Sequence, residues 1–350
     1  MSLGLATATL RTSVHREPRM IRSILISIIA VVFALGHPAL ANTLTFQAWP
    51  EDLPRYTLTR SQVEANWEQL TGGKRGPFPD ASSLRAEAAR YPQLMATTQT
   101  IVERNRDHPR LQEALLDWSD HDYRIAAGII ADAWVALFNG DFSTAWELGR
   151  LVGPPGYFPA LYALALNAQY LETDPDKRIA QLELVINETR ELLKQAPDHE
   201  FLQFGHAYAK SRRLETMGML EARSTGFLEE ILAALEKLDK QDPDNLYTVT
   251  LRGAVYAGTL EKAGSMLARM TYRIRPAMVD EAFSRALALN TRGFAAPMLE
   301  YAIALEKFAG EDRRKDIHNL LLQASAIKPN SAEAALHQQV AKQWLTGSRQ

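Results

Sequence analysis

Apolar residues recur every three or four positions along most of the chain from Pro109 onward. Clear examples are the stripe from Leu182 to Leu193 and the stripe from Leu228 to Leu238. This spacing gathers apolar side chains on one face of an α-helix, and that face needs a partner to pack against. Sustained alternation of apolar and polar positions, which is typical of β-strands, is almost absent. The pattern therefore predicts an all-α fold.

Turns that contain proline or glycine divide this region into helices of about 12 to 20 residues. Short turns of this kind join antiparallel helices that lie next to each other. The turns are expected at residues 139–141, 153–156, 174–176, 196–198, 241–244 and 328–330.

Residues 42–58 contain two prolines and have no clear period, which predicts an extended leader. Two short helices should follow it. One runs from Ser61 to Leu70 and ends at a pair of glycines, which supply the positive φ that terminates helices. The other runs from Ala81 to Tyr91, with Asp80 as its N-cap.

The first 41 residues have the three parts of a secretory signal peptide. A basic start at Met20 is followed by an apolar run from Ile24 to Leu35 and by the small-residue pattern Ala39-Leu40-Ala41. The apolar run is too short to cross about 30 Å of hydrocarbon. We predict cleavage after Ala41 and a periplasmic mature chain without a membrane span. Translation starts at either Met1 or Met20.

Composition excludes several classes of function. The chain has no cysteine, so thiol catalysis, disulfides and zinc–thiolate sites are ruled out. With 46% hydrophobic and 23% charged residues, it has the balance of a soluble protein with a substantial core. The net charge of −2 becomes more negative when residues 1–41 are removed, and no stripe of lysine and arginine is present. Nucleic acid is therefore not an expected partner.

Small residues recur where paired helices would touch. A tetratricopeptide unit of about 34 residues has small residues near positions 8, 20 and 27, an aromatic near 11 and proline near 32. Four successive segments resemble this pattern, through Ala133 with Ala145, Gly205 with Tyr208, Gly253 with Ala286, and Ala302 with Ala324 and Pro329. Gly205, Gly253 and Ala302 are expected to lie where paired helices press closest.

The resemblance to the tetratricopeptide-repeat (TPR) family covers roughly residues 122–340. It implies helical hairpins stacked into an α-solenoid, a right-handed superhelix with a concave face. A long loop from Lys262 to Pro276 departs from the pattern and leaves a closed or irregular array open. The elongated third unit looks like that of uncharacterised periplasmic TPR proteins. It is more distantly similar to the T component associated with TRAP-type solute transporters.

The expected organisation has three parts. Residues 1–41 are an N-terminal extension and signal peptide, residues 42–121 are leader and capping helices, and residues 122–350 are the TPR-like repeat domain.

Candidate binding residues follow from the repeat register. With Gly205 near position 8, the resemblance puts His199, His206 and Lys210 on the concave side. The two histidines would lie about 10 Å apart along one helix, too far for one metal ion. They would line a groove or bind a carboxylate or peptide terminus. No metal or cofactor is expected.

The same register puts Trp134 and Phe138 on the concave side of the first unit. Aromatic rings there could stack on an apolar ligand or anchor a side chain of a partner. The alternative is that both rings pack against the leader helices.

Catalytic signals are weak. Residues 117–122 combine aspartates with His121, but adjacent residues point to different faces and Ser or Asp before a helix is ordinarily a cap. The basic cluster of Lys210, Arg212, Arg213 and Arg223 is either a solvated face or an anion- or partner-docking patch. No nucleotide-binding, hydrolase or metalloprotease motif is found.

Two hypotheses of function result, and neither makes the protein an enzyme. The first is a periplasmic scaffold that binds a protein or peptide partner on its concave surface. The second is a solute-binding accessory subunit of a TRAP-type transport system that encloses a small ligand. An open groove would favour the first, and an enclosed cavity lined by Trp134, Phe138 and Tyr208 the second. An enzyme using His121 or His206 would need two titratable groups within hydrogen-bond reach in such a cavity.

Overall fold

The computed structural model describes residues 44–347. Among them it contains 16 α-helices and no strand, so the fold is all-α as predicted. Residues Phe46–Gln350 form one compact unit. The predicted signal peptide lies outside the described residues. No described helix combines the length and the apolarity that a membrane crossing requires.

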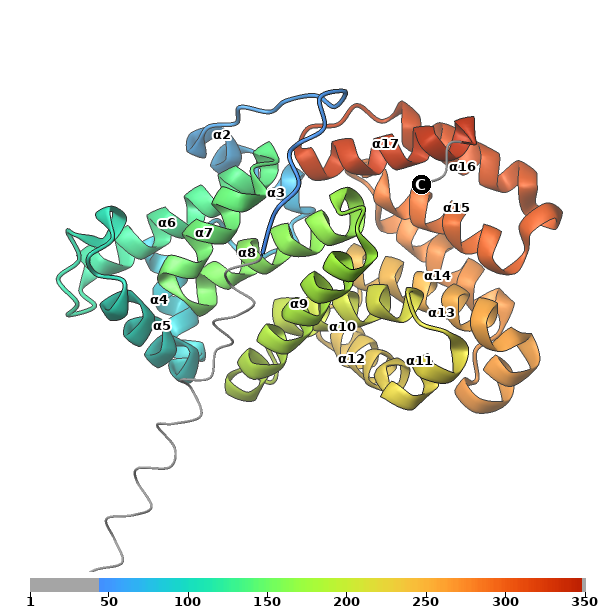
Figure 1. Cartoon of the computed structure of the whole chain (residues 1–350), viewed down its shortest axis with the longest axis horizontal. Coiled ribbons are helices and arrows are strands. Elements are labelled where there is room, and N and C mark those ends of the chain that lie inside the picture. Colours follow the sequence, from blue (N-terminus) through green and yellow to red (C-terminus); the bar gives the residue numbers. More distant parts are fainter. Residues whose placement is uncertain (1–43, 348–350) are drawn as a thin grey trace, which may run out of the picture. The chain divides into compact units, whose positions relative to one another are not determined.

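From α6 onward most helices follow one another with short connections, whereas longer segments join α3 to α4 and α5 to α6 (Figure 1). Their bounds are α2 (Arg60–Ala65), α3 (Trp67–Thr71), α4 (Ala81–Arg90), α5 (Pro92–Arg104), α6 (Asp120–Asn139), α7 (Phe142–Val152), α8 (Pro154–Leu166), α9 (Pro175–Gln195), α10 (Glu200–Glu215), α11 (Met219–Thr225), α12 (Phe227–Gln241), α13 (Leu246–Leu267), α14 (Pro276–Leu289), α15 (Ala296–Phe308), α16 (Arg314–Ala326) and α17 (Ala332–Thr346). Two π-helical turns, η3 (Asn167–Leu171) and η4 (Ala268–Tyr272), extend α8 and α13.

The residues at the helix ends are of the types that cap or terminate helices. Asp80 caps α4 in a capping box with Ser83, as predicted. Gly140 adopts the left-handed conformation after α6, and Asp141 caps α7. Gly153 separates α7 from α8. The first residue of α8 is a proline, which lacks an N–H group, and this costs nothing because the first N–H groups of a helix have no partner within the helix.

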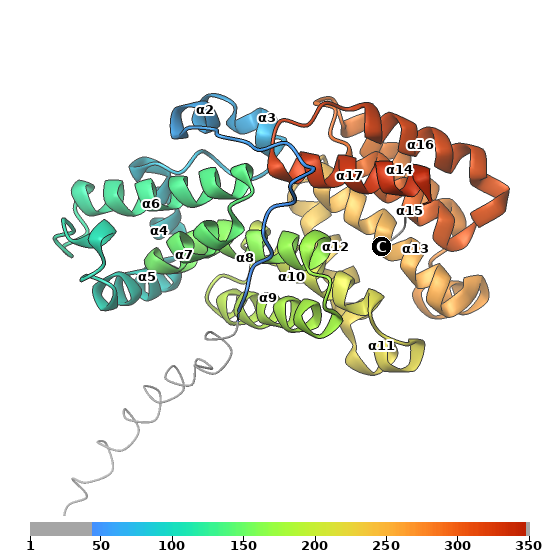
Figure 2. The same cartoon turned by 45° about the horizontal axis from the view of Figure 1, so that its top comes forward.

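Consecutive helices pack on each other as hairpins. Contacts join α6 with α7, α10 with α12, α13 with α14, and α15 with α16, which are the pairs expected from the repeat pattern, and α9 also packs on α10. Further contacts join α7 with α8, α13 with α15, and α16 with α17. Figure 2 shows the same helices from a second direction. The chain is therefore an array of helical hairpins.

The leader packs into the same core as the first repeat. Trp67 of α3 meets Trp134 of α6 edge to face, with ring centroids 5.3 Å apart. Both indoles are buried, and Phe138 lies beside them at 1% exposure. Aromatic burial of this kind ties residues before α6 firmly to the repeat helices.

The ends of the described chain also meet. Helix α17 contacts α6, and Gln339 of α17 donates a hydrogen bond to Asp52 at 2.9 Å. Arg292, between α14 and α15, pairs with Glu68 of α3 at 2.8 Å. The leader is thus bonded to the last helices as well as to the first.

The third unit differs from its expectation. A long loop was predicted from Lys262 to Pro276, but α13 continues to Leu267 and η4 follows it. Gly264, at φ 73° and ψ 156°, kinks the helix, and only residues 273–275 lie outside helical turns. Glycine permits this conformation because it has no Cβ.

The expected tight contact of Gly253 is confirmed, and that of Gly205 is wrong. A Cβ added at Gly253 would lie 2.5 Å from the ring of Phe283, and Ala302 is fully buried. A Cβ added at Gly205 would instead find its nearest neighbour, Thr189 Cγ2, at 3.9 Å. Helix α10 faces a cavity at this point, which explains the free space.

Alanine at these two glycines should therefore have opposite effects. Gly253→Ala is expected to destabilise the fold by about 1–3 kcal/mol, because the buried Phe283 ring must shift. Gly205→Ala should be neutral or stabilise by up to about 1 kcal/mol through helix propensity. Urea unfolding followed by circular dichroism measures both. Equal destabilisation of the two variants would mean that Gly205 is also a close helix contact.

Candidate functional site

A cavity of about 110 Å³ lies between the repeat helices and opens partly to solvent. Its walls come from α8, η3, α9, α10, α13, α17 and the start of α15. A cavity of this order can hold a small organic molecule. Most of the lining is apolar or aromatic, and a few charged side chains reach into it, which is the composition typical of ligand sites.

Arg75 supplies a cation to this cavity from the segment between α3 and α4. Four aromatic rings surround its guanidinium, with ring centroids of Tyr247 at 4.1 Å, Tyr162 at 4.7 Å, Phe201 at 5.2 Å and Phe204 at 5.4 Å. Cation–π contacts of this kind stabilise and orient the charged group.

The hydrogen bonding of Arg75 is far from complete. Of the five N–H donors of a guanidinium, one donates to Tyr162 Oη at 3.1 Å, and no carboxylate of the described residues forms an ion pair with Arg75. Burial alone would lower the Arg75 pKa, but the oxygens of Tyr162, Tyr247 and Glu333 outweigh it and raise the pKa. The side chain is therefore charged and has donors left for a ligand.

Glycines and ion pairs fix the segment that carries Arg75. Gly72, Gly73 and Gly76 have positive φ and turn the chain away from α3. Lys74 Nζ lies 2.8 Å from Asp242, and Arg292 donates to the Gly72 carbonyl at 3.0 Å. The leader is thereby anchored to the connections that follow α12 and α14.

Tyr162 links Arg75 to Glu333 of α17. Its hydroxyl accepts from Arg75 and donates to the Glu333 carboxylate. Burial, followed by the charge of Glu333, raises the Tyr162 pKa well above 10. The phenol therefore stays protonated, and its two hydrogen bonds connect Arg75 with Glu333.

A second hydrogen-bonded pair, Tyr170 and His337, lies at another side of the cavity. The Tyr170 hydroxyl is 3.1 Å from His337 Nε2, and η3 brings Tyr170 into the lining. Burial raises the Tyr170 pKa well above 10 and lowers the His337 pKa below 6.5. Both groups are neutral near pH 7, and both shifts move them away from the pKa values that suit proton transfer.

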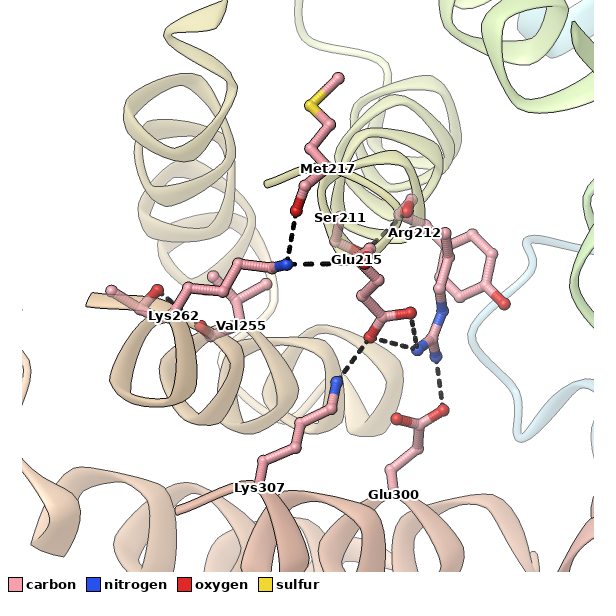
Figure 3. A network of polar contacts seen from close by, with 10 residues as sticks. Ser211, Arg212, Glu215, Met217, Val255, Lys262, Glu300 and Lys307 are labelled. Carbon is pink, nitrogen blue, oxygen red and sulfur yellow. Dashed lines mark hydrogen bonds and ion pairs between the residues drawn. The ribbon is translucent and has the colours of Figure 1, made fainter. Parts of the chain in front are cut away.

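The remaining buried charge of the lining is neutralised within the protein. Arg212 of α10 pairs with Glu300 of α15 and with Glu215, whose carboxylate lies 3.2 Å from Arg212 Nη1. Figure 3 shows the guanidinium between the two carboxylates, with Lys307 reaching Glu215 from α15 at 2.9 Å. Burial alone would lower the Arg212 pKa, but the charges of the two carboxylates outweigh burial and raise the pKa above its ordinary value. Arg212 is thus a paired cation, unlike Arg75.

Helix α15 begins at the cavity without a side-chain cap. Ala295, Ala296 and Pro297 line the cavity, and no side chain accepts from the first turn of the helix. Free N–H groups and the positive end of the helix dipole both favour an anion. This makes α15 a second source of positive potential besides Arg75.

The sequence-predicted aromatics lie elsewhere. Trp134 and Phe138 are buried against Trp67 of the leader, which is the alternative considered for them, and neither lines the cavity. Of the three aromatics named for an enclosed cavity, only Tyr208 lines it.

His199, His206 and Lys210 are not brought together at the cavity. His199 lies between the rings of Tyr91 and Phe158. His206 Nδ1 is 2.8 Å from Thr189 Oγ1 of α9, and burial, followed by the charge of Lys210, lowers its pKa to about 4. Lys210 is buried and pairs with Glu230 of α12. The face of α10 toward the cavity carries instead Phe201, Phe204, Gly205, Tyr208 and Arg212.

Residues 117–122 have a structural role. The Asp122 carboxylate accepts hydrogen bonds from the backbone N–H groups of Leu115 and Trp118, at 2.7 and 2.8 Å. The partner of His121 is the carbonyl of Glu113, 2.9 Å away, and not an aspartate. Among residues 44–347, no group of three or more histidine and acidic side chains could hold a metal ion.

The basic cluster is dispersed over separate contacts. Arg213 pairs with Glu183 and Glu221, while Arg212 turns inward to Glu300. Arg75 was missed because its segment reads as a glycine-rich turn. Its only local signal is a pair of basic residues inside Gly72-Gly73-Lys74-Arg75-Gly76.

Comparisons of the chain with protein-family models, with curated proteins and with solved structures gave no match.

Proposed function

We propose that the protein binds a small apolar molecule with an anionic group, such as a carboxylate, in the cavity between its repeat helices. The observation that carries this proposal is Arg75, a charged group enclosed by four aromatic rings with most of its donors unused. Two parallel N–H donors match a carboxylate in distance and direction. The uncapped start of α15 adds favourable potential for the same charge.

Apolar walls support an apolar body on the ligand. Leu161, Leu251 and Ala254 line the cavity together with the rings of Phe158 and Phe294. Burying apolar surface contributes about 25 cal/mol per Å² removed from water, while the charged contact fixes orientation. A ligand with one charged end and one apolar end satisfies both parts of the site.

Of the two hypotheses of function formed from the sequence, this proposal corresponds to the second, a solute-binding accessory subunit that encloses a small ligand. A partner-binding scaffold would be supported by an open groove wide enough for a helix, whereas the cavity with its half-buried cation, Arg75, supports a small ligand. With the predicted export signal and the resemblance to TPR proteins, the corresponding role is a periplasmic solute-binding accessory of a TRAP-type transport system. Binding is favoured over proton-transfer chemistry because burial moves the pKa values of Tyr170 and His337 away from neutral pH, in opposite directions.

Calorimetric titration with benzoate and benzamide tests the proposal. The two probes have nearly the same size and shape, but only benzoate is charged. We expect benzoate to bind at least tenfold more tightly, because a charge-assisted hydrogen bond contributes roughly 1.5–3 kcal/mol. Equal affinities, or binding of benzamide alone, would refute an anion site at Arg75.

A further inference from the structure

Exposed large hydrophobic side chains are concentrated in one place. Among residues 44–347, seven such side chains are exposed, and five belong to two short segments, namely Met219, Leu220, Met266, Leu267 and Met270. Leu220, Met266 and Met270 are exposed by 79%, 77% and 71%. Single exposed apolar residues are common, but a cluster of them marks an interaction site.

The two segments lie next to each other. Lys262 of α13 donates to the Met217 carbonyl, just before α11, at 2.8 Å. Helix α11 and the light-orange end of α13 with η4 are neighbours in both views (Figures 1 and 2). We call residues 219–223 and 264–275 together the methionine tip. None of them lines the cavity that contains Arg75.

Arginines outnumber acidic side chains among these apolar residues, although Glu229 of α12 reaches Tyr272. The methionine tip contains four arginines, Arg223, Arg269, Arg273 and Arg275, and one acidic residue, Glu221. All four arginines are exposed, and none forms an ion pair within the described chain. Glu221 is paired with Arg213, outside the tip. A chain of net charge −2 thus carries a local cluster of unpaired cations.

The departure of the third unit from the repeat pattern creates this surface. Gly264 kinks α13, and the π-helical turn η4 follows, so the helix end does not continue the packed face of α13. Ala268 and Ile274 stay buried and hold the segment to the core, while Met266, Arg269 and Met270 between them are exposed. Ala268 and Ile274 therefore anchor this extra segment to the core, while its methionine and arginine side chains are exposed to solvent.

We propose that the methionine tip docks the protein on an anionic phospholipid surface. Unbranched methionine side chains can adapt to the acyl boundary, and arginines beside them can pair with lipid phosphates. Anionic lipids attract clustered arginines near a membrane surface. Burial of the apolar side chains at the acyl boundary adds a hydrophobic contribution to this attraction. An acidic protein would also attract the arginines, but a lipid surface meets the charges and the apolar side chains together without needing a shape complementary to the tip.

Vesicle co-sedimentation with the full chain, as purified from the cells that make it, tests this docking. One set of vesicles contains equal amounts of phosphatidylglycerol and phosphatidylcholine, and the other contains phosphatidylcholine alone. All variants carry the same N-terminus, so differences between them report the tip. We expect binding to the anionic vesicles to exceed binding to the neutral ones by roughly tenfold or more.

Two substituted proteins and a matched control separate the contributions. The triple variant L220S/M266S/M270S should bind anionic vesicles roughly tenfold more weakly. The variant R269Q/R273Q should lose most of the preference for anionic lipid. The control L115S/L322S removes the two exposed leucines outside the tip and should bind like the unsubstituted protein.

Several results would overturn the proposal. They are absence of binding to anionic vesicles, unchanged binding of the triple serine variant, or equal loss in the control. Binding of soluble polyglutamate that survives the serine substitutions and competes fully with vesicles would assign the tip to an acidic polypeptide instead. Benzoate titration of the same variants keeps this outcome separate from the function of the cavity.

Discussion

Replacing Arg75 with glutamine is expected to weaken benzoate binding by roughly a hundredfold and to leave the fold intact. Of the two arginines among the described residues that line the cavity, Arg75 is the one without a carboxylate partner, and most of its donors make no hydrogen bond within the described chain. Glutamine is shorter and uncharged, so it offers neither the bidentate geometry nor the charge. Calorimetric titration measures the loss of affinity, and thermal unfolding checks the fold.

Arg90→Gln is the matched control for this experiment. Arg90 lies at the end of α4, is mostly exposed and pairs only loosely with Asp198 at 3.7 Å. The same chemical change there should leave benzoate affinity unchanged. If R75Q bound benzoate as tightly as the unsubstituted protein, the anion would have to be held by another group, and the assignment of Arg75 would be wrong.

Replacing Arg212 with methionine is expected to destabilise the fold by about 3–5 kcal/mol. The Glu300 side chain is only 11% exposed, and Arg212 is its ion-pair partner (Figure 3). Removing the cation leaves a carboxylate buried without compensation, which is far more costly than losing an exposed pair. Urea unfolding at neutral pH measures the change in the free energy of unfolding.

A second substitution tests the cause of that loss. R212M/E300L removes both charges and should recover most of the stability, because two apolar side chains can replace a buried ion pair at little cost. The exposed pair Lys240–Glu236 provides the control, and Lys240→Met should change stability by less than about 0.5 kcal/mol. A double variant no more stable than R212M would show that packing, and not the unpaired carboxylate, causes the loss.

Helices and their ends could be predicted from the sequence because their causes are local. The cap at Asp80 and the turn at Gly140 each depend on a few neighbouring residues. The hairpin pairs could also be predicted, since short turns leave consecutive helices little choice but to pack on each other.

The cavity could not be predicted, because its parts come together over long distances in the sequence. Arg75 and Tyr162 are 87 positions apart, and Tyr162 and Glu333 are 171 positions apart. The sequence pattern predicts that the leader caps the array, and nothing local indicates that it supplies the cation of the site. Only the fold places that cation among four rings.

The repeat register predicts that His206 and Lys210 lie on the ligand-binding face of α10. In the structure, a neighbouring face of α10 lines the cavity. Tyr208 and Arg212 line the cavity, whereas His206 bonds to α9 and Lys210 to α12. Positions two residues apart point in very different directions on a helix, so a small error in the assumed orientation exchanges a ligand contact for a helix contact.

The most direct test is a crystal structure of the protein grown with 4-bromobenzoate, located by the anomalous signal of bromine. We predict one bromine peak among the apolar side chains of the cavity. The carboxylate should accept two hydrogen bonds from the Arg75 guanidinium, between the rings of Tyr162 and Tyr247. A bound molecule outside the cavity, or an empty cavity with Arg75 turned onto Glu333, would contradict the account.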